Sequence, residues 1–493
     1  MAILVHNKNE ALKNFLFAGA AVFAASASNA ADLPSGKSGP VSYVKICDAY
    51  GAGFFTLPGS DTCLKIGGFV RVEYQYAPGK RVYSVATGAV TQVAGAQDTS
   101  GSEVRAQIIL DARTPTELGT ARTYIRMRAL NVSGIRSERA PGNFDTAYSS
   151  NGNRTTITLE RAFVTLNGFT FGNMSSEYAG LWPSGSVVGG SADFTPGWNN
   201  GIKGVSYVKK FGDWTAALEI HDQADTAVQN GSGVPAGLLA PTATNSLYLH
   251  TPRTGYNGAA VIRNEGAWGG IEVGAVVGNN STSDGPFPSA NGPKPLLGSR
   301  TYFSWAVEST LQIKLPMIAA GDEFFLNVGY SKGANGYAAA PDTVSTLVND
   351  AGNKRILGGI LIAPSSLSLT TIDAAGNPLT YGQERVFQAT ALFTHYWMPA
   401  WRSHFSAAYI NYSTPTAFNP VGGLNTQIGK VTVWAAKGNL IYSPAKNFDI
   451  GVEAGYGRMN AKIQNPTVAY VAAGSPGLRE GNWTTKFRVQ RGF

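Results

Sequence analysis

The sequence predicts an all-β fold: a transmembrane antiparallel β-barrel of sixteen strands, with short periplasmic turns and long external loops. Three observations predict this fold. Apolar and polar residues alternate with a period of two over segments of 9–13 residues, the connections between these segments alternate between short and long, and the chain ends in an amphipathic strand. Beyond residue 31, no run approaches the roughly 18 consecutive apolar residues that indicate a membrane-spanning helix.

Residues 1–30 are predicted to be a signal peptide. Lys8 and Lys13 precede an apolar run of eleven residues at 15–25, and small residues follow this run. The run is shorter than the roughly 20 residues that a spanning helix needs. We therefore expect cleavage between Ala30 and Ala31 and export of the mature chain, residues 31–493.

The only two cysteines of the chain, Cys47 and Cys63, lie in one short segment that is rich in glycine and proline. In an exported protein, two isolated cysteines are expected to form a disulfide. A metal site is disfavoured because no histidine lies near them and two thiols make a poor ligand set. A bridge that closes a loop of this size contributes about 3 kcal/mol in the chain-entropy model.

The alternation of residue types places the strands. In one example, Val70 and Val72 alternate with Arg71 and Glu73, which gives one apolar and one polar face. Strands of this kind are longer than the usual ~5–6 residues of soluble sheets. We predict strands at 65–76, 102–112, 117–130, 154–167, 169–174, 201–209, 214–221, 255–263, 269–279, 302–315, 323–332, 384–396, 402–412, 428–442, 447–458 and 482–493.

The connections between the predicted strands fall into two sets. Short connections occur at 114–117, 168, 210–213, 264–268, 316–321, 397–401 and 443–446, and long ones at 77–101, 131–153, 175–200, 222–254, 280–301, 333–383, 413–427 and 459–481. Their strict alternation predicts that all long loops lie at one end of an antiparallel meander, as in outer-membrane barrels. An even strand number then puts both termini on the periplasmic side. Alternation alone does not say which face is inside, so a soluble β-sandwich stays an alternative.

The last predicted strand carries an assembly signal. Trp483, Phe487, Val489 and Phe493 share one face, and the chain ends in an aromatic residue. A terminal amphipathic strand ending in Phe is typical of outer-membrane barrel precursors. We assign Phe487, Val489 and Phe493 to recognition by the barrel-assembly machinery.

Four stretches carry a resemblance to a known family. They are "CDAYGAGFFTLPGSDTCLKIGGFVRVEY", "KLPMIAAGDEFFLNVGYSKGA", "FTHYWMPAWR" with "SPAKNFDIGVEAGYGR", and the closing "FRVQRGF". Together they resemble the general porins of alphaproteobacterial outer membranes. The resemblance covers most of residues 31–493, with strands and loops over 64–493. It implies a sixteen-stranded barrel, usually a homotrimer in outer-membrane lipid of a Gram-negative cell. The resemblance also implies that the third long loop folds into the lumen of each barrel. Small hydrophilic solutes and ions would then diffuse passively through the lumen.

The predicted wall of such a pore is basic. Arg122, Arg126 and Arg128 share one face of a single strand, with apolar residues on the other face. At the bilayer midplane each arginine would cost about 2–4 kcal/mol on the lipid face, so this face must point into water. Arg71 and Arg105 lie on the polar faces of the first two strands. We predict that the five arginines form a basic wall at the pore constriction.

The third long loop, residues 175–200, is the candidate constriction. It is rich in small residues, and its only charged residues are Glu177 and Asp193. We expect these carboxylates to face the arginines and to produce a transverse field that disfavours bulky apolar solutes. The alternative is an external loop with solvated carboxylates.

Other functions are disfavoured. The chain has five histidines, no Gly-x-Ser-x-Gly elbow and no His-Glu-x-x-His motif, so we predict no enzyme, no metal site and no cofactor. The formal net charge is +8, or +7 without residues 1–30, because two lysines and one glutamate are lost; it is dispersed, which argues against nucleic acid as a partner. Two alternatives stay open, a substrate-selective channel and a secreted soluble β-rich binding protein.

Overall fold

A computed structural model describes residues 45–76, 82–86, 89–93, 100–133, 154–183, 201–222, 255–281, 301–338, 355–357, 360–362, 367–372, 378–383, 385–413, 427–464 and 479–493. Residues 46–493 form one compact unit. The predicted signal peptide, its cleavage site at Ala30 and Ala31, and Asp193 lie outside the described residues. None of the described helices has the length and apolar content needed to cross a membrane.

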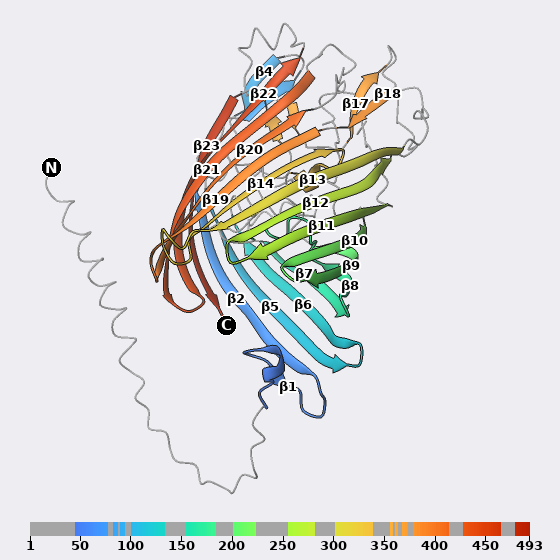
Figure 1. Ribbon diagram of the computed structural model, residues 1–493. Coiled ribbons are helices and arrows are strands. Elements are labelled where there is room, and N and C mark those ends of the chain that lie inside the picture. Colours follow the sequence, from blue (N-terminus) through green and yellow to red (C-terminus); the bar gives the residue numbers. More distant parts are fainter. Residues whose placement is uncertain are drawn as a thin grey trace, which may run out of the picture. The chain divides into compact units, whose positions relative to one another are not determined.

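The structure is a closed antiparallel β-barrel of sixteen strands, as predicted (Figure 1). The barrel strands are β2 (Cys63–Tyr76), β5 (Ser100–Thr116), β6 (Gly119–Val132), β7 (Arg154–Leu166), β8 (Phe169–Met174), β9 (Ile202–Phe211), β10 (Trp214–Asp222), β11 (Tyr256–Gly266), β12 (Gly269–Ser281), β13 (Thr301–Lys314), β14 (Glu323–Lys332), β19 (Arg385–Met398), β20 (Trp401–Ser413), β21 (Gln427–Ala445), β22 (Phe448–Gln464) and β23 (Arg479–Gly492). Each pairs with its neighbours along the chain, and the first and last strands close the ring from Phe69↔Gly492 to Tyr76↔Thr485.

The short turns follow elementary turn chemistry. Between β7 and β8, Asn167 has φ 49° and Gly168 has φ 82°. Two consecutive residues with positive φ are the signature of a type I′ hairpin turn, in which Asn-Gly is strongly preferred. The predicted turn at Gly168 is therefore real, and Asn167 belongs to it.

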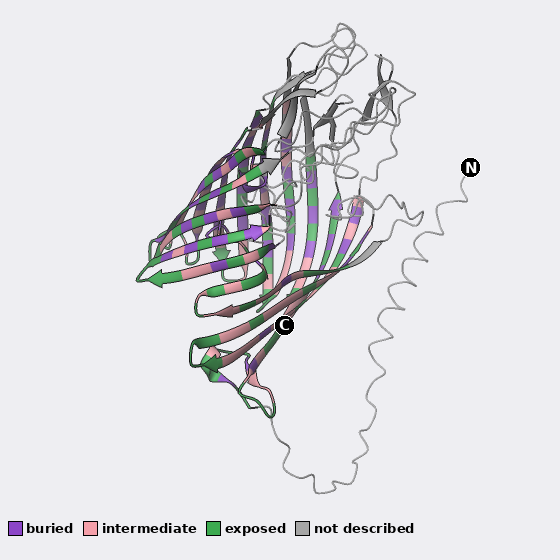
Figure 2. Cartoon of the chain, turned by 90° about the vertical axis from the view of Figure 1, so that its right-hand side faces the viewer, coloured by how far each residue is buried: buried purple, intermediate pink, exposed green. Residues whose placement is uncertain are grey.

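Burial along the strands tells the two faces of the barrel apart, as the alternating stripes in Figure 2 show. On β2, Val70 and Val72 face outward and are each 47% exposed, whereas Arg71 and Glu73 face inward and are 7% and 1% exposed. Further exposed apolar residues are Ile108, Leu159, Phe171, Ile220, Val273, Phe303, Val328 and Phe487. A soluble sandwich buries its apolar face, whereas a membrane barrel turns it towards lipid. The outward apolar face thus rules out the soluble binding protein.

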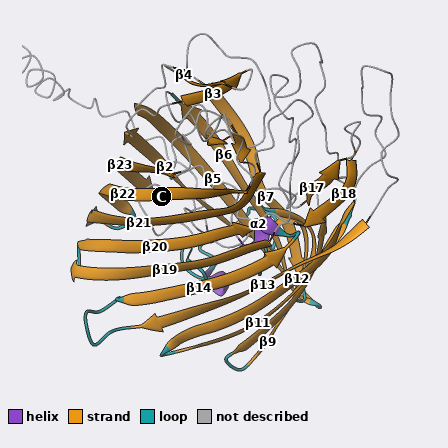
Figure 3. Ribbon diagram, turned by 90° about the horizontal axis from the view of Figure 1, so that it is seen from above, coloured by secondary structure: helices purple, strands orange, loops and turns teal. Residues whose placement is uncertain are grey.

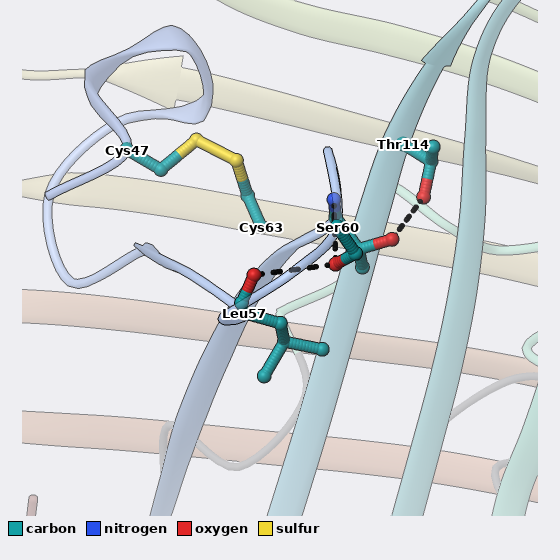
Figure 4. Close-up of a disulfide and its surroundings, with 6 residues drawn as sticks. Cys47, Leu57, Ser60, Cys63 and Thr114 are labelled. Carbon is teal, nitrogen blue, oxygen red and sulfur yellow. Dashed lines mark hydrogen bonds between the residues drawn. A yellow bond between two sulfur atoms is a disulfide. The ribbon is translucent and has the colours of Figure 1, made fainter. Parts of the chain in front are cut away.

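The predicted Cys47–Cys63 disulfide is present, with the two Cα atoms 6.0 Å apart (Figure 4). It closes a loop that contains the short helix η1 (Asp48–Tyr50) and strand β1 (Phe55–Thr56), which pairs with the start of β2. Phe54 packs against the two cysteines. The Thr62 and Thr114 hydroxyls form a 2.8 Å hydrogen bond that ties the loop to β5. The disulfide loop is therefore fixed to the barrel where β2 begins.

Two of the predicted long loops contain secondary structure that the sequence analysis did not anticipate. Residues 77–101 include a hairpin of β3 (Val82–Ala86) and β4 (Ala89–Val93). Residues 333–383 include α2 (Asn335–Ala338), the hairpin of β15 (Arg355–Leu357) and β16 (Ile360–Ile362), and the hairpin of β17 (Leu367–Ile372) and β18 (Pro378–Gln383). The three hairpins form two-stranded sheets that are separate from the barrel ladder.

The C-terminal residue completes the closure between the first and last strands. The backbone N–H of Phe493 donates to the carbonyl of Gly68 at 3.1 Å. A Cβ at Gly68 would lie 2.9 Å from the ring of Phe493, so the ring rests where a larger residue would clash. Phe487 and Phe493 both face outward.

We predict that deleting Phe493 lowers the yield of inserted barrel, because it removes both the aromatic end of the last strand and the bond to Gly68. Phe493→Tyr keeps an aromatic ring and the bond, and it should insert like the wild type. The measurement is the heat-modifiable fraction in isolated outer membranes. Equal yields for the wild type and the deletion would contradict the assigned assembly signal.

Candidate functional site

The predicted arginines lie on the inner face of the barrel, carried by β2, β5 and β6. The five are Arg71, which is buried, and Arg105, Arg122, Arg126 and Arg128, which are partly buried. Their neighbours on the strand, such as Val70, Val104 and Met127, are exposed on the outer face. The structure thus agrees with the energetic argument that kept arginine off the lipid face.

Each arginine lies against a polar partner on the same wall. The Arg71 Nε donates to Gln490 Oε1 at 2.7 Å, and Arg105 pairs with Glu103 at 2.8 Å. Arg122 pairs with Asp111 at 2.9 Å. The wall therefore consists of arginines interleaved with carboxylates.

A bulge between β6 and β7 shapes the middle of this wall. The register shifts between Arg126 and Met127, which places one extra residue of β7, Glu160, opposite β6. The Glu160 carboxylate then pairs with Arg126 at 3.0 Å and with Arg128 at 2.7 Å. One carboxylate is thus shared by two guanidinium groups.

Positive charge exceeds negative charge along this wall. Among the described residues, this wall carries eight inward arginines against four carboxylates: Arg71, Arg105, Arg113, Arg122, Arg126, Arg128, Arg161 and Arg488 against Glu73, Glu103, Asp111 and Glu160. Such an excess on a surface that lines water attracts anions.

The first part of the third long loop lies against the opposite inner wall. We call residues 175–183 the inward segment. The Ser176 hydroxyl donates to one oxygen of Glu219 at 2.7 Å, and the Glu177 N–H donates to the other at 2.6 Å. The Leu181 N–H donates to Glu272 at 3.1 Å. Carboxylates of β10 and β12 therefore hold the backbone of the segment to the wall.

Apolar contacts also hold the inward segment against the inner wall. The ring of Trp182 packs edge-on against Phe325, with centroids 6.1 Å apart. Tyr178 fills space left by Gly274, where a Cβ would lie 2.8 Å from its ring. Burial raises the pKa of the Tyr178 phenol well above its ordinary value, so this side chain is neutral. The described part of the loop is thus packed inside the barrel.

The structure places Glu177 elsewhere than the sequence analysis expected. Its carboxylate pairs with Arg263 of β11 at 3.1 Å, and Arg263 also pairs with Glu272 at 2.6 Å. The arginines of β5 and β6 pair with carboxylates of their own wall, and Arg71 of β2 donates to the side-chain oxygen of Gln490. The sequence analysis did not identify Arg263, the last residue of the predicted strand 255–263, or Arg161, whose Nε donates to Ser175 at 2.8 Å.

A closed barrel with an apolar outer wall and a charged inner wall defines an integral β-barrel protein of the bacterial outer membrane. Within this class, the model of the porin subfamily matches residues 35–481, and the chain belongs to that family.

Several known proteins are similar to this chain. Porin Omp2a of Brucella melitensis biotype 1 is 36% identical over 165 residues, which cover 32% of this chain and 41% of that protein. Porin Omp2b of Brucella suis biovar 1 is 32% identical over 212 residues, which cover 39% and 52%. The chain thus matches about half of the length of these relatives. The outer membrane channel DcaP of Acinetobacter baumannii has the same fold, with a TM-score of 0.54 at 16% identity over 89% of this chain and 99% of that one.

Proposed function

We propose that the protein forms a water-filled pore through which small hydrophilic solutes and ions diffuse passively across the outer membrane. The observation that carries the proposal is the inward wall of arginines and carboxylates on β2, β5, β6 and β7. A sixteen-stranded barrel leaves an aqueous channel unless something fills it. Charged side chains on that inner wall are solvated in such a channel, and they are costly anywhere else in a membrane.

The inward segment is the proposed constriction. It starts directly after β8, is held by Glu219 and Glu272, and brings Tyr178 and Trp182 inside the ring of strands. The arginine wall faces the remaining space. The transverse electric field that we predicted from the sequence then runs from these arginines across the pore towards the inward segment. Glu177 contributes to this field through its pair with Arg263.

The functional unit that we propose is a homotrimer in outer-membrane lipid. Of the residues at 67–70, "GGFV", the small residues Gly68 and Val70 lie on the outer face of β2, which permits close packing of a second barrel. The remaining apolar outer face contacts lipid.

Two measurements test the proposed function: the conductance of the protein in a planar bilayer, and the swelling of liposomes that contain it when solutes enter. A general pore gives a stepwise, ohmic conductance and a flux that falls smoothly with solute size. A substrate-selective channel instead gives a conductance that one class of solute blocks at saturating concentration. Purified, heat-modifiable protein that produces neither conductance nor flux would overturn the proposed pore.

A further inference from the structure

One sector of the inner wall is apolar, which is unexpected where a barrel encloses water. Its residues face inward from β10 to β13 and are almost fully buried: Ala217, Ala259, Val261, Val276 and Ala306. They are buried because two aromatic side chains cover them, Tyr178 of the inward segment and Tyr337 of α2. These two tyrosines come from different long loops.

The second of these loops turns into the barrel directly after β14. Gly333 has φ 71°, a left-handed conformation that favours glycine, and it forms a parallel bridge with Trp305 of β13. Two residues later α2 begins; it contacts β13, β14 and β19, and Ala338 lies against the inward-facing Gly329 of β14. Seen from above, α2 lies within the outline of the strands (Figure 3). Ala338 has no exposed surface at all. Residues 333–338 therefore lie inside the barrel.

Tyr337 extends through the interior of the barrel to β10 and β11, which are not neighbours of β14 in the sheet. Its hydroxyl accepts a 3.0 Å hydrogen bond from the Asn257 side chain on β11 and is hydrogen-bonded to His221 on β10. Its ring meets Tyr178 edge-on, with centroids 5.4 Å apart and planes at 82°. One side chain thus joins the two inward loops to β10 and β11.

We propose that residues 333–338 are a second inward element and that Tyr337 is a positioning residue for the inward segment. Tyr337 holds Tyr178 against the apolar sector, and the bonds to His221 and Asn257 fix Tyr337 itself. Two loops, not one, then define the narrow part of the lumen, and solutes pass along the arginine wall. The inference rests on the proposed pore for its functional consequence, although the positioning itself is measurable without conduction.

Tyr337→Phe removes the hydroxyl and keeps the ring, and Tyr337→Ala removes both. Loss of a net hydrogen-bond contribution increases local opening by about two- to tenfold. The matched control is Tyr330→Phe, because Tyr330 lies on the outer face of β14, where its ring is tilted at 42° against that of Trp305. All variants keep the barrel ladder, which heat-modifiable migration verifies.

The first measurement is hydrogen exchange at the amides of Glu177 and Leu181, which donate to Glu219 and Glu272. We expect exchange to be about two- to tenfold faster in Tyr337→Phe, faster still in Tyr337→Ala, and unchanged in Tyr330→Phe. Exchange at the wild-type rate in Tyr337→Ala would overturn the positioning role, whether or not the protein conducts.

The second measurement is single-channel current. Transient closures should become about two- to tenfold more frequent in Tyr337→Phe, with ion selectivity unchanged because the arginine wall is intact. A quiet, wild-type-like current in a Tyr337→Ala pore would overturn the two-loop constriction and leave the proposed pore standing. A wild-type barrel without any conductance would instead count against the proposed pore.

Discussion

Replacing both Arg126 and Arg128 with Ser will shift the ion selectivity of the pore towards cations. In the wild type these two arginines share the Glu160 carboxylate, so the cluster carries one excess positive charge. The double variant leaves Glu160 without either guanidinium and converts the cluster to one negative charge. A fixed charge about 7 Å from a passing ion contributes about 0.6 kcal/mol in water, or roughly threefold in local ion concentration, for each charge removed.

The measurement is the reversal potential under a salt gradient. Screening reduces the effect, because the Debye length is about 10 Å at 0.1 M salt, so the shift should grow as the salt concentration falls. Glu160→Gln is the matched control: it removes the shared carboxylate, keeps both arginines and should shift selectivity towards anions. The amount of folded barrel should stay near the wild type, because the backbone ladders that pair β6 with β5 and β7 do not depend on these side chains.

An unchanged reversal potential in the double variant would place Arg126 and Arg128 away from the narrow part of the pore. It would leave the fold intact and contradict the basic wall as the selectivity element. A shift in the same direction for the double variant and for Glu160→Gln would likewise contradict the charge argument.

The barrel itself could be predicted from the sequence because a membrane imposes a strict pattern. Each strand must present apolar residues to lipid and polar residues to water, so a period of two marks every span. The bounds of β8 and β14 agree with the prediction at both ends, and the other strands differ by a few residues. The inward position of Arg122, Arg126 and Arg128 followed from the same constraint.

The partners inside the barrel could not be predicted from the same pattern. Alternation gives the face of a residue but not the residue that it meets. Glu160 pairs with two arginines only because a bulge shifts the register of β7, and the sequence carries no signal for that bulge. Glu177 meets Arg263 because the inward segment crosses to β11, a contact over 86 positions.

The role of the second inward element, residues 333–338, could not be predicted either, because it depends on contacts between residues far apart in the sequence. Tyr337 follows a predicted strand in a long loop, where periodicity predicts nothing. Its partners, His221 and Asn257, lie 116 and 80 positions away. Apolar residues on an inward face, such as Val261 and Val276, were the available signal, because water-lining positions of a barrel are polar.

Replacing residues 176–182 with a short Gly-Ser linker will widen the pore. This change removes Tyr178 and Trp182 from the lumen, together with the backbone groups that bind Glu219 and Glu272. The barrel should still close, because the hydrogen-bond ladders from β9 to β14 do not involve the segment. The matched control replaces residues 316–321, the short turn between β13 and β14, with a linker of the same composition.

Single-channel conductance and liposome swelling with sugars of increasing size measure the result. We expect a higher conductance and entry of larger sugars for the 176–182 variant, and wild-type values for the turn variant. The conductance rises because ions are then limited by the strand ring and residues 333–338 rather than by the inward segment, and the size limit rises because the two aromatic side chains no longer occupy the path. The apolar sector that Tyr178 covered, including Val261 and Val276, becomes exposed to water. This exposure lowers the free energy of unfolding, but we expect the strand ladder to keep the barrel folded. An unchanged size limit in a correctly folded variant would show that the inward segment is not the constriction and would assign the narrow part of the pore to other residues.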